Sequence, residues 1–469
     1  MPTTSETPVL IVGGGPAGLA VAVELARHDV PSLLVERRQT LSSHPRATVL
    51  SLRSMELMRA WGLEAAVHAR AADVDARMLD VETLSRAADG APLEVGYPTR
   101  EQSRVLSPVA VACIAQDDVE PLLLARLRER SSARVALGTE VTGLVARADG
   151  VEVGLRDVRT GAARTVRAGY VVAADGARSA VRRALGIELV GAEDVLAGVT
   201  ALLRAPLWDV VGEYRHLLYS VNHPDAAGTF LPTGRSDRWL YGFRPESGAA
   251  PDNERTAELV RAGAGVPDLP VHIERSRPFS SAAQVATRFR CGRVLLAGDA
   301  AHRVTPRGGT GLNLALHDGF DLGWKLAWVL RDWAGSALLD SYEAERRPVA
   351  EHTAARSADP RGSLRAPECE VHADLGGRIR HAWSGDRSTL DLLGTGLTLF
   401  AARGSGWDDH GAPHHTPAPV TVQLLDPLAA RAVGAAGNGA VLVRPDGTPI
   451  DVLTRDGAMT GRPAARPRG

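Results

Sequence analysis

The chain has 469 residues, 44% of them hydrophobic, which is enough to bury a large core and predicts more than one domain. Its 54 Lys and Arg residues nearly balance its 55 Asp and Glu residues, so no global field steers the protein towards nucleic acid or an acidic membrane. Three scattered cysteines fit neither a disulfide framework nor a metal site, and without a secretion signal or a run of about 18 apolar residues we expect a cytoplasmic protein with no membrane segment and no metal.

The first predicted element is a strand followed by a phosphate-binding turn. An apolar run at residues 9–12 predicts the strand, and helical sequence follows to about residue 28. The turn between them contains Gly13, Gly15, Pro16, Ala17 and Gly18. In a dinucleotide-binding turn the first glycine makes the bend, the second lets the backbone approach a pyrophosphate, and the third allows close packing of helix on strand.

A second short strand, at residues 32–35, ends in an acidic residue. Glu36 is placed to accept hydrogen bonds from the hydroxyls of an adenosine ribose, and we assign the adjacent Arg37 to the same site. Strand, glycine turn, helix, strand and acid together predict a bound dinucleotide. They leave open whether it is FAD or NAD.

Residues 170–174 repeat the pattern of an apolar strand followed by an acid and a glycine. Asp175 and Gly176 end the strand, and Ser179 is predicted to cap a short helix that contains Arg182. By itself this segment could be a strand with a helix cap. Its distance from the other motifs indicates one nucleotide site assembled from separated pieces of the chain.

The part of the chain that should choose a substrate follows. Strands of an antiparallel sheet are predicted at residues 199–203, 216–221, 229–231 and 239–243. The aromatic residues that are candidates to line a pocket on this sheet are Tyr219, Phe230, Trp239 and Tyr241. Because side chains alternate along a strand, only some of these rings can face a ligand, and core packing is the commoner fate of a strand aromatic.

The most informative segment is an apolar strand at residues 293–297 that leads into a glycine-rich turn and a helix at about 312–330. Asp299, after Gly298, lies at the carboxyl end of the strand, where open α/β sheets bind ligands, and its carboxylate can accept hydrogen bonds from a ribityl chain. The residues of the turn and helix start that we assign to the cofactor are Pro306, Gly309, Gly311, Leu312 and Asn313.

A helix N-terminus at this place favours a flavin. A reduced isoalloxazine ring carries negative charge along its N1–C2=O edge, and the first N–H groups and the dipole of a helix stabilise negative charge. An ordinary glycine-rich loop with a capping aspartate would explain the residues singly. It would not explain their order of strand, acid, proline, glycines and helix, so FAD is the predicted dinucleotide.

The three motifs together resemble those of single-component FAD-dependent aromatic hydroxylases of the p-hydroxybenzoate hydroxylase class. The resemblance covers most of residues 8–360 and includes the segment 338–348. It implies FAD as cofactor, NADPH or NADH as reductant, and O2 and a small aromatic molecule as substrates, with oxygen transfer through a C4a-hydroperoxyflavin. It also implies catalytic roles beside the flavin for Arg46 and Pro306, and contact of Gln116 with the ribityl or pyrophosphate portion of FAD.

Residues 376–400 are similar to the thioredoxin-like tail of phenol hydroxylase relatives, and within that group to hydroxylases that tailor bacterial aromatic polyketides. Predicted strands lie at residues 397–400, 420–425 and 440–443. The tail has no Cys-x-x-Cys pair, so we expect a structural or assembly role in place of thioredoxin redox chemistry. Residues 448–453 lack the aromatic residue that relatives usually carry in a further strand.

The predicted fold class is α/β: a Rossmann-like FAD-binding domain with an inserted antiparallel-sheet substrate domain and a C-terminal thioredoxin-like domain. The predicted bounds are 1–185 with 276–365 for the FAD-binding domain, 186–275 with part of 75–105 for the substrate domain, 366–460 for the C-terminal domain and 461–469 for a disordered tail. We expect a monomer or a homodimer.

Two alternatives to aromatic hydroxylation share the same motifs. A Baeyer–Villiger or epoxidising oxygenase on this scaffold would differ only in its substrate pocket. A non-catalytic flavoprotein that binds an aromatic compound would have no need of a helix start that stabilises reduced flavin.

Overall fold

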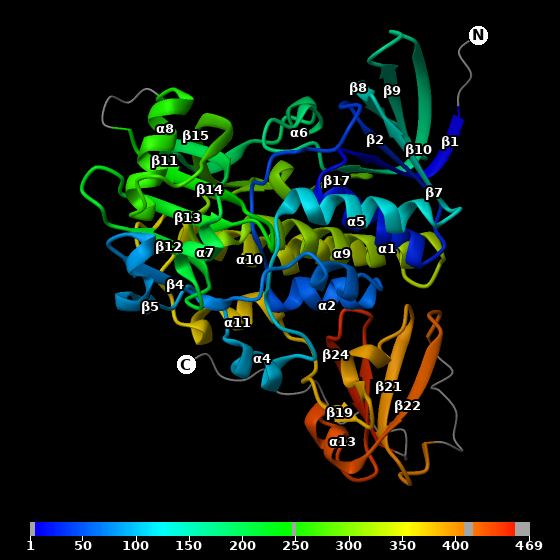
Figure 1. The fold of residues 1–469 in the computed structure, drawn as a ribbon. Coiled ribbons are helices and arrows are strands. Elements are labelled where there is room, and N and C mark those ends of the chain that lie inside the picture. Colours follow the sequence, from blue (N-terminus) through cyan, green and yellow to red (C-terminus); the bar gives the residue numbers. More distant parts are fainter. Residues whose placement is uncertain (1–4, 246–249, 408–415, 455–469) are drawn as a thin grey trace.

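The computed structural model describes residues 5–245, 250–407 and 416–454, which form three main sheets with their helices (Figure 1). The first sheet lies at the upper right of Figure 1, the second at the left, and the C-terminal sheet at the lower right. Most strands of the second sheet lie in the chain between two neighbouring strands of the first, but two come earlier and one comes later, so both sheets are built from segments far apart in sequence.

The first sheet is mainly parallel and has the predicted Rossmann-like arrangement. Its strands run in the order β16-β17-β10-β1-β2-β7, with β9 and β8 added beside β10. Their bounds are β1 Ser5–Val12, β2 Ser32–Glu36, β7 Ala133–Leu137, β8 Thr139–Ala146, β9 Val151–Asp157, β10 Ala163–Ala173, β16 Arg290–Cys291 and β17 Val294–Leu296. β1 pairs in parallel with β2 and β10, and β10 pairs in parallel with β17. The carboxyl ends of β1, β10 and β17 therefore lie at one edge of the sheet, and the predicted α/β fold class is confirmed.

Helices α1 (Pro16–Arg27) and α9 (Gly311–Leu330) pack against each other beside this sheet (Figure 1). Nearly every residue of α9 is buried because the helix also contacts α2 and α10, and its position confirms the predicted helix at about 312–330. The other elements of this part are β3 Val49–Leu50, α2 Leu52–Ala60, α3 Glu64–His68, α4 Arg100–Leu106, β6 Ala112–Cys113, α5 Gln116–Arg128, α6 Ala180–Ala184 and α10 Leu338–Ala358. Within the described ranges, no helix has the length and apolar character needed to cross a bilayer.

The second sheet has the strand order β18-β15-β11-β14-β13-β12-β4-β5. Its elements are β4 Asp75–Val81, η1 Leu84–Asp89, β5 Ala91–Leu93, β11 Leu189–Arg204, α7 Leu207–Val211, β12 His216–Val221, β13 Gly228–Pro232, β14 Arg238–Phe243, α8 Asn253–Ala264, β15 His272–Ala286 and β18 His302–Arg303. β12 and β4 are parallel while the other neighbours are antiparallel, so the sheet is mixed where we expected a wholly antiparallel one. The boundary that we predicted at residue 275 falls inside β15, a continuous strand that links the two sheets.

One face of the second sheet is aromatic and belongs to a hydrophobic core. Each of Tyr219, Phe230, Trp239 and Tyr241 is fully buried among residues of α7, α8 and η1. The rings of Phe230 and Tyr241 stack with their centroids 4.4 Å apart. This placement corrects the expectation that these four rings line the substrate pocket, because strand alternation turns them to the side that the helices cover.

The opposite face carries a row of leucines. Leu240 in β14 pairs with Leu202 in β11 on one side and with Leu231 in β13 on the other, so the three side chains lie in register on one face. We call these residues the leucine row. Sequence reasoning missed them, although the same period-two alternation that places the aromatic rings would have found them.

The C-terminal region forms a four-stranded sheet in the order β22-β21-β23-β24. Its elements are α11 Pro367–Leu375, β19 Trp383–Ser384, β20 Arg387–Ser388, η4 Thr389–Leu392, β21 Leu397–Ala402, β22 Val420–Leu425, α13 Pro427–Val433, β23 Ala440–Val443 and β24 Pro449–Leu453. The three predicted strands are confirmed, and β24 forms although it lacks an aromatic residue. The thioredoxin-like identity of this region stays a prediction, and the predicted tail 461–469 lies outside the described residues.

Ion pairs join the C-terminal region to α2, and the pair between Arg378 and Glu56 is buried. Figure 1 shows the C-terminal sheet beside α2. Arg378 donates to both oxygens of Glu56 at 2.6 and 2.9 Å, and both side chains are 4% exposed. Arg59 donates in the same two-pronged manner to Asp391, at 2.6 and 2.9 Å. A buried charge pair is tolerated only when its hydrogen bonds are complete, so these contacts fix the position of the region on the first domain.

A carboxylate at this junction predicts a pH dependence of stability. Asp374 in α11 accepts the backbone N–H of Arg53 at 3.1 Å, and burial raises its pKa from 3.8 to about 6. Because folding raises this pKa, the contribution of Asp374 to stability is present below about pH 4 and is lost as the pH rises through about 6.

We therefore expect Asp374→Asn to raise the free energy of unfolding by about 1–3 kcal/mol at pH 8 and to change it little at pH 4. Urea unfolding of both proteins at the two pH values measures the difference. Asp386→Asn, at an exposed turn, is the control. An equal effect of Asp374→Asn at both pH values would contradict the prediction.

Candidate active site

Three glycine turns meet at the carboxyl ends of β1, β10 and β17. Gly13 has φ +113°, and a Cβ atom there would lie 2.2 Å from the carbonyl oxygen of Ala174, just after β10. Gly298 has φ +62°, and a Cβ atom there would lie 2.8 Å from the Cβ of Ala17 in α1. Only a residue without a side chain allows these approaches. The three motifs found in the sequence therefore form one site.

The first glycine turn combines close packing with open space. A Cβ atom at Gly18 would lie 2.0 Å from the carbonyl oxygen of Gly13, whereas a Cβ atom at Gly15 would meet no atom within 4 Å. α1 begins at Pro16, so the unpaired N–H groups and positive dipole end of its first turn border this space. The arrangement is suited to a phosphate group.

Glu36 is held beside this turn at the end of β2. Its Oε2 accepts the N–H of Gly14 at 2.8 Å, and its Oε1 accepts the N–H and Nε of Arg38 at 2.9 and 3.0 Å. Burial raises the pKa of Glu36, but these hydrogen bonds outweigh burial and hold the pKa below its usual value. The carboxylate keeps lone pairs for ribose hydroxyls. Arg37 is exposed and has no hydrogen bond or ion pair among the described residues.

Asp175 uses one carboxylate oxygen to cap α6. Its Oδ2 accepts the N–H groups of Ala180 and Val181 at 2.7 and 3.2 Å, while its Oδ1 is buried and has no partner in the described part of the chain. Ser179 accepts the N–H of Arg182 at 2.9 Å, which confirms the predicted helix cap. A buried oxygen without a partner is unfavourable unless a ligand or water donates to it.

Asp299 lies in a concave part of the surface. Its side chain is exposed, yet enough protein surrounds it for desolvation to raise its pKa, against the opposing charges of His302, Arg46 and Arg303. Its carboxylate has no hydrogen-bond partner among the residues that the structure describes. It is therefore available to accept hydrogen bonds from ligand hydroxyl groups, and its contact with a ribityl chain stays a prediction.

Asp318, a residue that sequence reasoning missed, fixes the turn that carries Asp299. It is fully buried in α9, and its Oδ2 accepts the N–H of Gly298 at 3.1 Å and Nε2 of His302 at 2.5 Å. Its Oδ1 accepts Nε of Arg346 at 2.8 Å. Burial raises the pKa of Asp318, but His302 and Arg346 lower it to about 2. The signal in the sequence was an acid inside an apolar helix, where a charge needs a partner.

Side-chain hydrogen bonds hold the turn before α9 through its carbonyl groups and do not use the first N–H groups of the helix. Tyr97 donates its hydroxyl proton to the carbonyl of Gly309 at 2.9 Å, and Asn313 Nδ2 donates to the same carbonyl at 3.2 Å. The Oδ1 of Asn313 accepts a backbone N–H from the segment before α2 at 2.8 Å. The Asn313 side chain is therefore a structural tie. Its backbone N–H, with those of Gly311 and Leu312, has no partner within the helix.

Arg46, Gln116 and Pro306 border the site. Arg46 and Pro306 are exposed, and the charge of Arg46 acts on Asp299. Gln116 begins α5 and donates its side-chain N–H to Glu120 at 2.7 Å. Their contacts with a cofactor stay predictions.

These residues fit FAD by their own geometry. The positions of Gly15 and Gly176 leave open space, and the buried oxygens Asp175 Oδ1 and Thr310 Oγ1 lack partners in the described ranges. Each is a feature that a ligand would complete, and all belong to the turns at the carboxyl edge of the parallel sheet, where such sheets bind nucleotides.

Comparison with known proteins agrees with this geometry. A family model described as an FAD binding domain matches residues 6–357. Tetracenomycin A2 monooxygenase-dioxygenase of Streptomyces glaucescens is 35% identical over 526 residues, which cover 95% of this chain and 93% of the relative. Aklavinone 12-hydroxylase of Streptomyces peucetius is 40% identical over 356 residues, which cover 74% and 73%.

Solved structures give the same result over nearly the whole chain. The ternary complex of aklavinone-11 hydroxylase with FAD and aklavinone has a TM-score of 0.82 at 30% identity and covers 96% of each chain. The flavin-dependent monooxygenase PieE, in complex with FAD and substrate, has a TM-score of 0.84 at 28% identity and covers 95% of each. The predicted resemblance and the predicted FAD cofactor are thus confirmed, and the chain belongs to the FAD binding domain family as an FAD-dependent monooxygenase of the aromatic hydroxylase type.

Proposed function

We propose that this enzyme uses NAD(P)H and O2 to hydroxylate a phenolic, polycyclic aromatic polyketide. The observation that carries the proposal is the free N-terminus of α9 beside the three glycine turns, because a reduced flavin needs that positive end and a simple aromatic-binding protein does not. The relatives, which include tetracenomycin and aklavinone oxygenases, support the substrate class. When bound, FAD would be the group that accepts hydride from the nicotinamide and activates O2.

In this proposal the residues of the chain bind FAD, orient the substrate and stabilise negative charge on the reduced flavin. With FAD bound, the N–H groups of Gly311, Leu312 and Asn313 would stabilise negative charge on the reduced flavin, and Asp299 would accept hydrogen bonds from ribityl hydroxyls. We assign Pro306 to packing beside the reacting edge and Arg46 to holding the cofactor. No side chain is required as an acid or base in this account.

The leucine row is our proposed substrate surface. Leu202, Leu231 and Leu240 lie on the sheet face opposite the aromatic core. A flat apolar surface orients an aromatic ring and excludes water, which raises the yield of oxygen transfer over loss of hydrogen peroxide.

The test of this function measures oxygen in the product. The purified yellow protein is incubated with NADPH or NADH, ¹⁸O2 and phenolic polycycles, and O2 uptake and product mass are followed. Hydroxylation predicts substrate-stimulated uptake and one labelled oxygen on an aromatic carbon. A labelled ester or lactone would instead favour a Baeyer–Villiger reaction, an epoxide would favour the epoxidising alternative, and absence of stimulation by any aromatic would favour a non-catalytic flavoprotein.

Asp299→Ala is expected to weaken FAD binding by roughly tenfold to a hundredfold, because charged groups contribute about 1.5–3 kcal/mol per hydrogen bond. The fold should persist, since Asp299 makes no hydrogen bond with another described residue. Titration of the apoprotein with FAD, followed by flavin fluorescence, measures the affinity. The control is Asp225→Ala, at an exposed turn of the second sheet. Unchanged flavin content in Asp299→Ala would count against the assignment.

A further inference from the structure

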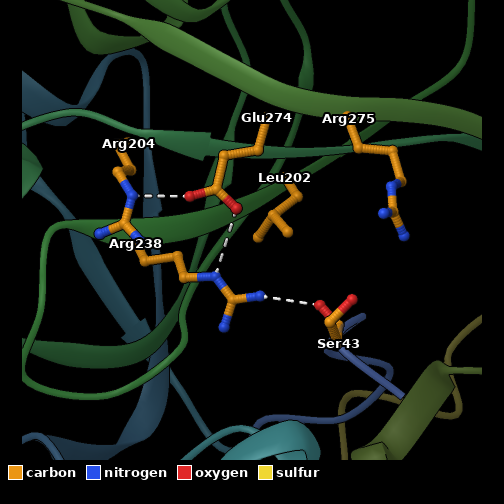
Figure 2. Close-up of a pocket in the computed structure, with 6 residues that line it drawn as sticks. All are labelled: Ser43, Leu202, Arg204, Arg238, Glu274 and Arg275. Atoms are coloured by element: carbon orange, nitrogen blue, oxygen red, sulfur yellow. Dashed lines mark hydrogen bonds and ion pairs between the residues drawn. The ribbon is translucent and has the colours of Figure 1, made fainter. Parts of the chain in front are cut away.

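A polar cavity of about 260 Å³ lies between the second sheet and the loop before β3 (Figure 2). It is lined by Ser43, Leu202, Arg204, Arg238, Glu274 and Arg275. Leu202 is the one apolar side chain of this lining, whereas pockets for polycyclic aromatic rings are mostly apolar. The lining therefore favours a charged ligand over the aromatic substrate.

Strand alternation gathers arginines on the same sheet face as the leucine row. Arg275 in β15 pairs with Leu202, and Arg277 lies two residues further along the strand, so both belong to this face. Arg204 at the end of β11 lies opposite Arg238 at the start of β14. Four guanidinium groups from three adjacent strands thus share one end of the sheet.

Two of these four arginines have carboxylate partners and two have none. Arg204 Nε lies 2.6 Å from Glu274 (Figure 2). Arg238 lies 2.8 Å from Asp117 in α5. Arg275 and Arg277 have no hydrogen bond or ion pair with any described residue. Figure 2 shows the Arg275 guanidinium extending beside the cavity without a contact to the other residues drawn. Unpaired arginines at a cavity are available to an anion.

A fifth arginine comes from the opposite wall. Burial and then the charges of Arg275, Arg46 and Arg277 lower the pKa of His44, so guanidinium groups of the loop and of β15 surround one imidazole. Arg46 acts on Asp299 as well, which places this positive region next to the flavin site.

We name the arginine cluster for its members Arg46, Arg204, Arg238, Arg275 and Arg277. We propose that the arginine cluster binds phosphate groups of the nicotinamide reductant. The proposal rests on the proposed function, which requires a second dinucleotide. The glycine turn after β1 serves FAD, so the reductant needs another anion site. Guanidinium forks match phosphate oxygens, and the two side chains without a partner among the described residues, Arg275 and Arg277, are suited to a diphosphate or a dianionic monophosphate.

The test removes the two arginines that have no partner. Arg275→Gln and Arg277→Gln keep hydrogen-bonding side chains without the charge, and Arg275→Lys restores the charge without the fork. Arg86→Gln is the matched control, because Arg86 is 64% exposed and pairs with Asp89 on the helical side of the same sheet. Anaerobic rapid mixing measures how the rate of flavin reduction depends on NADPH and NADH concentration. Calorimetric titration with NADP⁺ measures binding independently of catalysis.

We expect each Gln variant to weaken nucleotide binding about tenfold or more, with the limiting reduction rate and the FAD content unchanged. Weakening confined to NADPH and NADP⁺ assigns the cluster to the 2′-phosphate, and equal weakening for NADH assigns it to the pyrophosphate; both support the proposal. Unchanged nucleotide affinity overturns it, as does weakening only of an acidic aromatic substrate. If the wild type is reduced by nicotinamide and shows this dependence but oxygenates no aromatic, the proposed function fails while this inference stands.

Discussion

Gly15→Leu should abolish tight FAD binding and leave the apoprotein nearly as stable as the wild type. A Cβ atom at Gly15 would meet no atom within 4 Å, so a side chain there extends into the open space of the first glycine turn and competes with a ligand for it. Loss of two or three hydrogen bonds to a charged phosphate, at about 1.5–3 kcal/mol each, corresponds to roughly a hundredfold or greater loss of affinity. FAD titration of the apoprotein measures the affinity, and urea unfolding of the apoprotein measures stability.

The matched variant is Gly18→Ala, three residues along the same turn. A Cβ atom there would lie 2.0 Å from the carbonyl oxygen of Gly13, so the backbone must move and the apoprotein itself should lose stability. The two glycines therefore separate ligand space from packing space. Near-normal FAD affinity in Gly15→Leu would show that the pyrophosphate does not lie at this turn, and the cofactor assignment would have to be abandoned.

Asp318→Asn should lower the free energy of unfolding by about 3–5 kcal/mol, the usual cost of removing one member of a buried charge network. The fully buried carboxylate accepts from Gly298, His302 and Arg346, and an amide cannot satisfy all three donors. Arg346, whose side chain is 12% exposed, would lose its charged partner. FAD affinity should fall as well, because the turn that carries Asp299 would lose its brace.

Urea unfolding of the apoprotein at pH 7 isolates the stability effect from cofactor binding. Asp340→Asn in α10 is the control, since Asp340 is 71% exposed and its pair with Arg290 is expected to contribute about 1 kcal/mol or less. A change below about 1 kcal/mol for Asp318→Asn would mean that the Gly298 turn holds its shape without this network.

The sequence alone was sufficient to predict the cofactor site at the carboxyl edge of the parallel sheet. Gly13, Glu36, Asp175 and Asp299 each follow an apolar strand within a few residues, so local patterns were sufficient to predict the strands, the turns and the helix that begins at Gly311. Parallel strands bring their carboxyl ends to one edge, and the three motifs could therefore be assigned to a single site before their contacts were known. The predicted Ser179 cap is confirmed for the same reason, because a helix cap involves residues only three positions apart.

Only the tertiary structure decided which face of a strand meets a ligand and which distant residues are partners. Tyr219 and Tyr241 are aromatic residues of the kind that line ligand sites, but α7 and α8 cover the sheet face on which they lie. The leucine row lies on the opposite face. In the sequence Asp318 is an isolated acid, and only the folded structure shows that His302 and Arg346 lie beside it. Burial and charge pairing depend on contacts between residues far apart in the chain, and a local pattern carries no record of those contacts.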